Sequence, residues 1–277
     1  MAITAAEVNK LRQITGSGMM DCKNALVEAD GDIEKAIDIL RKKGQKVAAK
    51  RADRSANEGY VIAKTSQDST FGAILMLNCE TDFVGKTSDF IECAELIMNF
   101  AITNKVKQLQ DLLDAKIKDN NTVSDLLVDI TGKTGEKIEL NQYEVMEKPF
   151  VSSYNHNGNR LAAIVGFNKK SAGIETAGHE IAMQIAAMNP ISVDDKSVPQ
   201  SVIERELDIA REQIRNEGKP EEMVEKIAQG KLNKFFKEST LVNQDFIRDS
   251  KKTVGQYMKD IDAELTIEGF YRLQLGE

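Results

Sequence analysis

The pattern that most limits the fold of this chain is a hairpin followed by a helix, which occurs twice. In the first copy, apolar runs at 60–63 and 71–77 flank a polar turn. In the second, 150–154 and 161–167 flank the turn at 156–159, which contains Asn-Gly, a strong hairpin signal. An apolar stripe at helical spacing follows each hairpin. The sequence therefore predicts an α+β fold with a core of two related antiparallel-sheet and helix subdomains, produced by duplication.

The first hairpin leads into a corner with the sequence Asn78-Cys79-Glu80-Thr81-Asp82-Phe83-Val84. Corners on rigid elements are common positions for function. From the residues alone, Phe83 is predicted to fold inward, because large apolar side chains are mostly buried, and Asp82 to cap the next helix. Glu80 and Asp82 also form a carboxylate pair, but no other pattern indicates a cleft for acid–base chemistry around them.

Three short helical stripes precede the first hairpin and predict a small three-helix bundle. Thr4 and Glu7 form a capping box at the start of the first helix. Gly16 is expected to end that helix, and Gly31 to separate the second helix from the third. Gly44 is predicted to stop the third helix.

Two features of this N-terminal part have more than one interpretation. Met19 and Met20 follow a glycine turn; core packing is favoured, and an adaptable contact surface, which methionine suits, is the alternative. The stretch 41–54 is dense in Lys and Arg. A solvated linker is favoured there, since no aromatic residue is interleaved for stacking on bases, and contact with RNA or an acidic partner is the alternative.

A long antiparallel helical hairpin is predicted after the second subdomain begins. Ser201 and Glu204 form a second capping box, and apolar residues from Ile203 to Ile214 follow coiled-coil spacing. A Gly-Lys-Pro turn at 218–220 starts the return helix. The charged outer faces predict that the hairpin projects, either as a solvated arm or to pack on a second copy of the chain or another protein.

The remaining segments have weaker patterns. They predict helices at 106–117, 123–130 and 254–258, and strands at 136–145, 265–267 and 270–275.

Composition argues against membrane and secreted classes. The 277 residues are 41% hydrophobic and 29% charged, typical of a globular protein of about two domains. Because the net charge is -7, any surface that binds nucleic acid would have to be a local basic patch. No apolar run approaches the roughly 18 residues that span a bilayer. Cys22, Cys79 and Cys93 show no CxxC spacing, which indicates free thiols and a cytoplasmic location.

Catalytic residue patterns are scarce. His156 and His179 are not spaced as a metal pair. Gly-Lys-Thr occurs at 85–87 and 132–134, but Glu80 and Leu127 stand where a phosphate-binding loop needs a glycine. We therefore expect no enzyme activity, no metal site and no cofactor.

The chain resembles the bacterial elongation factor Ts family over most of its length. The residues that carry the resemblance are Leu11-Arg12, Thr15-Gly16, Gly18-Met19-Met20-Asp21-Cys22-Lys23, Ala25-Leu26, Gly31-Asp32-Ile33-Glu34, Ala36-Ile37, the corner Asn78 to Val84, Tyr154 with His156, His179-Glu180-Ile181-Ala182-Met183, Gly218-Lys219-Pro220 and Lys252-Thr253-Val254-Gly255-Gln256. Such long, ordered matches are far more specific than one short motif.

The resemblance implies a domain plan. On this basis we expect a UBA-like (ubiquitin-associated-like) three-helix domain with a basic linker at 1–54. A core N-subdomain is expected at 55–141, and a core C-subdomain at 142–199 and 240–277. The coiled-coil hairpin at 200–239 is inserted into the C-subdomain.

The resemblance also implies a function: guanine-nucleotide exchange on elongation factor Tu, bound both with GDP and without nucleotide, during translation elongation. Thr81, Asp82, Phe83 and Val84 match residues that face outward and disturb the partner's Mg²⁺ site, which reverses the inward prediction for Phe83.

Other matches imply further contacts with the same partner. Arg12, Met19 and Met20 match a bundle contact, and His156 matches a histidine near the phosphate-binding side. Direct contact with nucleic acid or membrane is not expected. A homodimer through the helical hairpin stays open. So does a second class of function, a non-catalytic adaptor or holdase that binds proteins through the bundle and hairpin.

Overall fold

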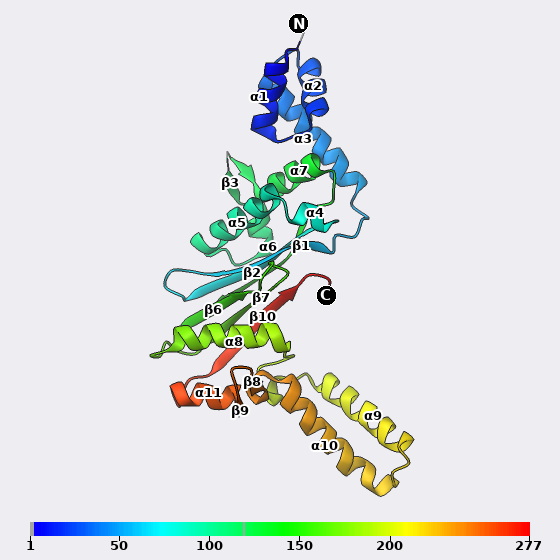
Figure 1. Cartoon of the computed structure of the whole chain (residues 1–277), viewed down its shortest axis with the longest axis vertical. Coiled ribbons are helices and arrows are strands. Elements are labelled where there is room, and N and C mark those ends of the chain that lie inside the picture. Colours follow the sequence, from blue (N-terminus) through cyan, green and yellow to red (C-terminus); the bar gives the residue numbers. More distant parts are fainter. Residues whose placement is uncertain (1–2, 119) are drawn as a thin grey trace.

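Two three-stranded antiparallel sheets form the centre of the part of the chain that the computed structural model describes, residues 3–118 and 120–277 (Figure 1). The first sheet has the order β1-β2-β5 and the second β10-β7-β6. In each, the second strand of a hairpin is central and a strand from later in the chain pairs with its other edge. The predicted repeat of hairpin and helix is therefore present, and the α+β prediction is confirmed.

The strands are β1 (Glu58–Thr65), β2 (Phe71–Cys79), β3 (Lys116–Lys118), β4 (Asn121–Thr122), β5 (Glu139–Glu147), β6 (Phe150–Asn155), β7 (Leu161–Phe167), β8 (Asp245–Phe246), β9 (Asp249–Thr253) and β10 (Ile267–Gln274). The α-helices are α1 (Ala5–Thr15), α2 (Met19–Glu28), α3 (Ile33–Lys50), α4 (Asp82–Gly85), α5 (Ser88–Thr103), α6 (Leu109–Asp114), α7 (Val123–Thr134), α8 (Ile174–Met188), α9 (Gln200–Asn216), α10 (Glu221–Ser239) and α11 (Val254–Ile261). Two short 3₁₀ turns lie at Asp195–Ser197 and Leu241–Asn243.

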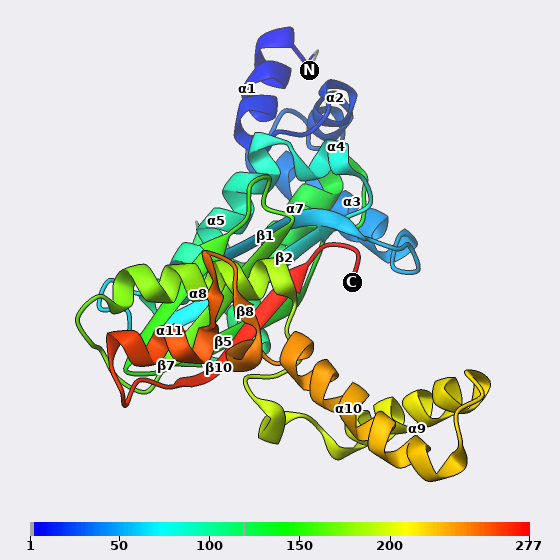
Figure 2. The same cartoon turned by 60° about the horizontal axis from the view of Figure 1, so that its bottom comes forward.

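The two sheets pack face to face, with helices on their outer faces (Figures 1 and 2). Because side chains alternate along a strand, Val61 and Ile74 join the layer between the sheets, whereas Ile62 and Leu75 join the core beneath α5. Helix α8 covers the outer face of the second sheet through Ile181. The bundle α1–α3 lies at one end of the molecule and the hairpin α9–α10 at the other.

The free edge of β1 is covered by the second hairpin. The side chain of Asn155 accepts from the Ala63 N–H at 2.7 Å and donates to the Ala63 carbonyl at 2.9 Å. The Val61 N–H donates to the Asn159 carbonyl at 2.7 Å. These bonds satisfy edge groups that would otherwise be open to pairing with another chain, and they fix the β6–β7 turn against β1.

The third helix of the bundle is longer than predicted. Thr4 and Glu7 form the predicted capping box of α1, and Gly16 ends that helix. Gly44, in contrast, is not a stop, because α3 continues to Lys50. A Cβ atom at Gly44 would lie 3.0 Å from the Val128 carbonyl oxygen of α7. Glycine is therefore needed for close helix packing at this position.

Most of the basic stretch predicted to be a solvated linker is helix α3, and three of its basic side chains are paired with acidic groups. Arg41 Nε lies 3.8 Å from a carboxylate oxygen of Asp129, and Lys43 pairs with Asp21. Arg51, the residue after the helix, contacts Glu80. The linker interpretation is therefore wrong for most of this stretch.

The helical hairpin buries its predicted seam within itself. Ala210 and Ile214 of α9 pack with Val224 and Ala228 of α10. The capping box predicted at Ser201 is wrong, because α9 already begins at residue 200, after Pro199, and has no side-chain cap.

Three of the weaker predictions need correction. The helix expected at 106–117 is the shorter α6, and β3 follows it. The two closing strands are the single strand β10, whose register shifts between Ile267 and Gly269. Gly269, with a φ of 159°, lies at this irregularity, and Glu268 and Gly269 interrupt the apolar pattern there.

The role of Gly44 can be tested by substitution. We expect Gly44→Leu to lower the free energy of unfolding by about 1–3 kcal/mol, because the side chain would push α3 away from α7. Gly230→Leu is the matched control, since Gly230 lies inside α10 with open space at its Cβ position. It should stabilise the protein by up to about 1 kcal/mol through helix propensity. Equal effects of the two changes in denaturant unfolding would contradict this packing role.

Candidate functional site: an exposed aromatic side chain on a rigid corner

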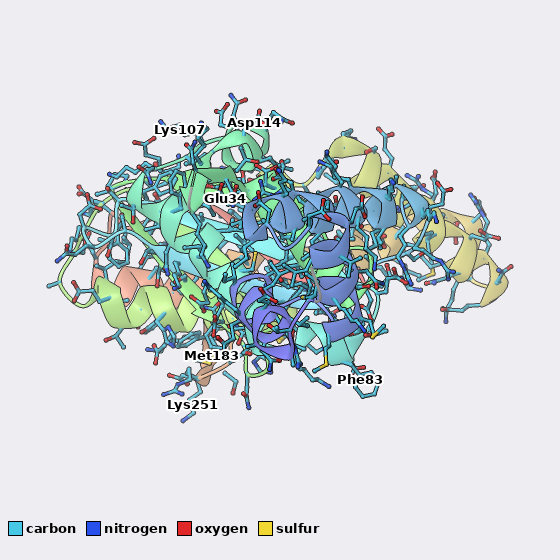
Figure 3. The ribbon with its side chains drawn as sticks, turned by 90° about the horizontal axis from the view of Figure 1, so that it is seen from above. Glu34, Phe83, Lys107, Asp114, Met183 and Lys251 are labelled. Atoms are coloured by element: carbon cyan, nitrogen blue, oxygen red, sulfur yellow. The ribbon has the colours of Figure 1, made fainter. Side chains whose placement is uncertain are left out.

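The most exposed large apolar side chain in the described part of the chain is Phe83, at 81%. It lies on α4, a single helical turn between β2 and α5, and points away from the body of the molecule (Figure 3). The inward position that residue patterns alone predicted for Phe83 is therefore wrong, and the outward position expected from the resemblance is observed.

The packing of α4 on β1 explains this orientation. Gly85 is buried, and a Cβ atom there would lie 3.2 Å from the Gly59 carbonyl oxygen and 3.4 Å from Cys79 Sγ. Val84 packs against the core under α5. Since Val84 and Gly85 take the inward positions of the turn, Phe83 is left on the solvent side.

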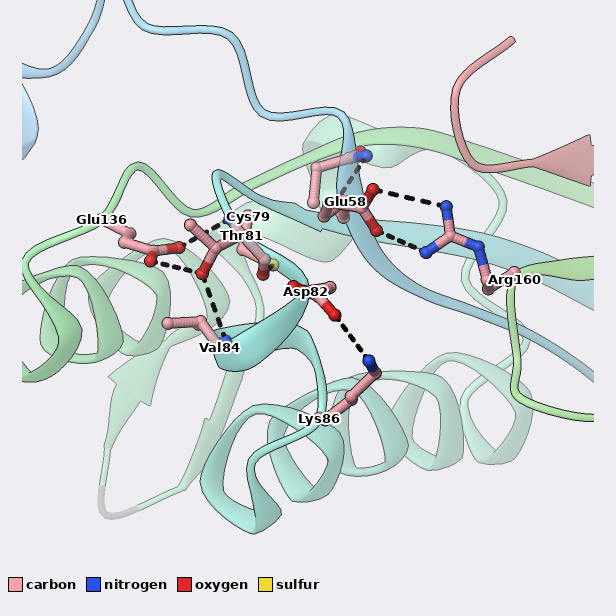
Figure 4. A network of polar contacts seen from close by, with 9 residues as sticks. Glu58, Cys79, Thr81, Asp82, Val84, Lys86, Glu136 and Arg160 are labelled. Carbon is pink, nitrogen blue, oxygen red and sulfur yellow. Dashed lines mark hydrogen bonds and ion pairs between the residues drawn. The ribbon is translucent and has the colours of Figure 1, made fainter.

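Hydrogen bonds hold the start of α4 (Figure 4). The backbone N–H and the hydroxyl of Thr81 donate to the two carboxylate oxygens of Glu136, at 3.0 and 2.7 Å. The same hydroxyl accepts from the Val84 N–H at 3.4 Å, so Thr81 caps the helix. The predicted cap, Asp82, is instead the first residue of α4, and its carboxylate lies 2.6 Å from Lys86 Nζ.

The two carboxylates of the corner have separate partners. Glu80 accepts both from Arg51, at 2.8 Å to each oxygen, and from the Lys137 N–H at 2.7 Å. The Lys137 N–H is the main cause that lowers the pKa of Glu80, and Arg51 adds to it. The hydrogen bond from Lys86 lowers the pKa of Asp82. Both groups are therefore ionised near neutral pH and do not share a proton, unlike an acid–base pair.

His156 lies in the β6–β7 turn, which runs beside the same strand as the corner. Its side chain is exposed, and Nδ1 lies 3.0 Å from the Tyr154 hydroxyl oxygen. Asn159 of this turn bonds Val61 of β1, two residues along from Gly59, where α4 packs. The corner and the turn with His156 are thus held close together along β1.

The bundle residues Arg12, Met19 and Met20 are exposed, Met20 at 63%. Core packing of the two methionines is therefore a wrong prediction. Helix α2 instead turns Cys22 and Leu26 inward, and its methionine end faces solvent. Figures 1 and 2 both show α4 at the end of the sheet region that faces the bundle.

Sequence reasoning missed the residues that hold this site. Glu136 is 55 positions from Thr81, so no local pattern connects them. Arg51 was assigned to a linker although it bonds Glu80. Gly85 carried a usable signal, because glycine is favoured where the backbone must approach another group closely.

Neither a metal-binding cluster nor a membrane-spanning helix is found in the described residues. No group of three or more His, Cys, Asp or Glu side chains is arranged to hold a metal ion in residues 3–118 and 120–277. Over the same ranges, no helix is both long and apolar enough to cross a membrane.

The chain is similar to known proteins over nearly its whole length. A family model described as Elongation factor TS matches residues 80–277. The chain is 51% identical over 274 residues to Elongation factor Ts of Christiangramia forsetii, covering 99% of each chain. It is 50% identical to Elongation factor Ts of Flavobacterium psychrophilum over 276 residues, covering 99% of each, and 50% identical to that of Amoebophilus asiaticus over 277 residues, covering 100% of each.

These matches, together with the α+β fold, define a translation elongation factor. Within that class, the chain belongs to the elongation factor Ts family.

The exposed position of Phe83 leads to a stability test. Phe83→Ala should change the free energy of unfolding by less than about 0.5 kcal/mol, because little packing is lost. The matched change Phe90→Ala should cost about 3–5 kcal/mol, since Phe90 is fully buried under the first sheet. A similar loss for both variants in urea unfolding would show that Phe83 is core.

The corner thiol should be inert. Burial, with a smaller contribution from the negative charges of Glu136 and Glu58, raises the pKa of Cys79 to about 12, and burial raises that of Cys93 to about 12. At pH 8 both remain neutral, so iodoacetamide should label neither in the folded protein and both in urea. Because the pKa of each thiol is higher in the folded than in the unfolded chain, the neutral thiols stabilise the folded state fully below about pH 8.5. This stabilisation is lost as the pH rises toward 12. Rapid labelling of folded Cys79 at pH 8 would contradict the burial of the corner.

Proposed function

We propose that this chain is a guanine-nucleotide exchange factor that binds elongation factor Tu, disturbs its Mg²⁺ site through the Phe83 corner, and promotes release of GDP. The observation that supports this proposal is a large aromatic side chain held in solvent on a helical turn whose first residues are bonded to Glu136. Solvent exposure of such a ring is unfavourable in the free protein, and burial in a partner removes this cost. Membership of the elongation factor Ts family supports this partner.

The physical basis of exchange is thermodynamic linkage. A factor that binds the nucleotide-free GTPase more tightly than the GDP-bound form weakens GDP binding by the same factor. Moving the partner from mostly closed to mostly open needs about 5.5 kcal/mol of differential binding. Burial of one phenylalanine contributes about 1.5–3 kcal/mol, so Phe83 is not sufficient alone.

Further contacts and the metal supply the rest of this free energy. Met19, Met20 and Arg12 offer a second contact from the bundle, and His156 a third beside β1. Asp82 stands next to the ring with its charge already balanced by Lys86, so it can approach the partner without a large change in net charge. Loosening of Mg²⁺ removes a charge that neutralises the phosphates of GDP, which weakens the nucleotide further.

We propose a one-to-one complex in the cytoplasm as the working form. The seam of the helical hairpin is buried between α9 and α10, so pairing of two copies through that seam would require the hairpin to open. The paired side chains at the corner also argue against a chemical step there, and we infer that the protein is not an enzyme.

Exchange can be measured with elongation factor Tu loaded with a fluorescent GDP analogue and chased with excess GDP. The wild-type chain should accelerate release, and Phe83→Ala should reduce the acceleration by roughly 10- to 150-fold, the equivalent of 1.5–3 kcal/mol. Met188→Ala is the control, because Met188 is another exposed apolar residue, at the end of α8. It should leave the acceleration unchanged.

A chelator arm tests the Mg²⁺ step. With excess EDTA, spontaneous release should rise and the advantage of the wild type over Phe83→Ala should shrink, because the ion that the corner disturbs is already gone. Full acceleration by Phe83→Ala would overturn the proposal. An unchanged advantage in EDTA would overturn the role assigned to Mg²⁺.

A further inference from the structure

The bundle is joined to the rest of the molecule along one side. Helix α3 packs on α7 where Gly44 meets Gly132. Arg41 of α3 also pairs with Asp129 of α7. Beside these contacts, a cavity of about 1290 Å³, open to solvent, lies between the bundle and α5, with Ile14 on the bundle side and Leu96 on α5. Because α3 and α7 form this joint, a rotation about their contact would change the distance between the bundle surface and α4.

Arg51 lies where this rotation would be resisted. It is the residue after the last turn of α3, and its Nη1 donates to both carboxylate oxygens of Glu80 at 2.8 Å. The Glu80 side chain is only 15% exposed, so solvent screens the pair less than it screens a surface ion pair. Removing Arg51 would leave the mostly buried Glu80 carboxylate bonded to the Lys137 N–H but without its ion-pair partner.

Glu80 connects three parts of the molecule. Its carboxylate binds Arg51 of the bundle helix and accepts the Lys137 N–H from the connection between α7 and β5. Its backbone directly precedes Thr81, which is bonded to Glu136 in that same connection. The end of the bundle helix is therefore attached to the residue from which the turn with Phe83 begins.

We propose that Arg51 and Glu80 are positioning residues, which fix the exposed Met19–Met20 surface of the bundle relative to Phe83. This role rests on the proposed function for the partner that would use both surfaces. Two contacts held at a constant separation bind one partner domain as a single event, and no ordering cost is incurred when the second contact forms. Neither residue needs to touch the partner.

The first test uses the free protein. Nitroxide spin labels at Met20→Cys and Phe83→Cys report the distance between the two surfaces, and the native cysteines are buried. The wild-type background should give one narrow distance distribution, and Arg51→Ala a broad one. Lys50→Ala is the control, since it removes the same charge from the neighbouring residue, which is exposed and has no ion pair within the described ranges.

A distribution as narrow in Arg51→Ala as in the control would overturn the proposal. If Arg51→Ala shows a lowered unfolding midpoint, Arg51→Gln replaces it, because glutamine keeps much of the side chain but carries no charge to pair with Glu80. Its distribution should be broader than that of Lys50→Ala, and an equal width would again overturn the proposal.

The second test uses the complex with elongation factor Tu. Arg51→Ala should lower the acceleration of GDP release by about fivefold at sub-saturating factor. The loss caused by Met20→Ala should be at least about twofold smaller in the Arg51→Ala background than in the wild type, because the contacts no longer act together. Equal losses in both backgrounds would overturn the positioning role. If the wild type itself fails to release GDP, the proposed function fails, whereas the distances in the free protein still decide the role of Arg51.

Discussion

The corner depends on a reciprocal exchange of hydrogen bonds between two short segments. Glu80 accepts the Lys137 N–H, and Thr81 donates twice to Glu136, so adjacent residues of each segment bond adjacent residues of the other. Charge-assisted bonds of this kind are shorter and stronger than neutral ones. They hold the start of α4 to the connection between α7 and β5, and the Gly85 contact with Gly59 holds it against β1, both without using the Phe83 ring. The ring is therefore free for a partner, and its position does not depend on its own packing.

Rigidity matters here because the binding free energy of one ring is limited. A flexible corner would lose part of that free energy in ordering the turn when the partner binds. The buried glycine contact at Gly85 and the cap by Thr81 remove this loss in advance. The same logic extends to the β6–β7 turn, where Asn155 and Asn159 bind the backbone of β1 and hold the segment that carries His156. Separate chain segments thus present their side chains from one rigid support.

Local sequence patterns are sufficient to predict much of the fold. Continuous apolar runs and an Asn-Gly turn specify the hairpins, and the capping box of Thr4 with Glu7 is a local hydrogen-bond pattern. Gly44 was misread because a helix-ending glycine and a close-packing glycine look alike until the opposing helix is known. Phe83 was misread for a similar reason. Its exposure follows from the approach of Gly85 to Gly59, a tertiary contact that burial tendencies do not contain.

Linkage between the factor and the nucleotide is the central claim, and calorimetric titration tests it most directly. The dissociation constant of this chain is measured for elongation factor Tu without nucleotide and for the GDP-bound form with Mg²⁺. We expect the nucleotide-free form to bind more tightly by about 10³- to 10⁴-fold, and Phe83→Ala to reduce this ratio of dissociation constants. Equal affinities for the two forms would contradict it, because a ligand without differential affinity shifts no equilibrium.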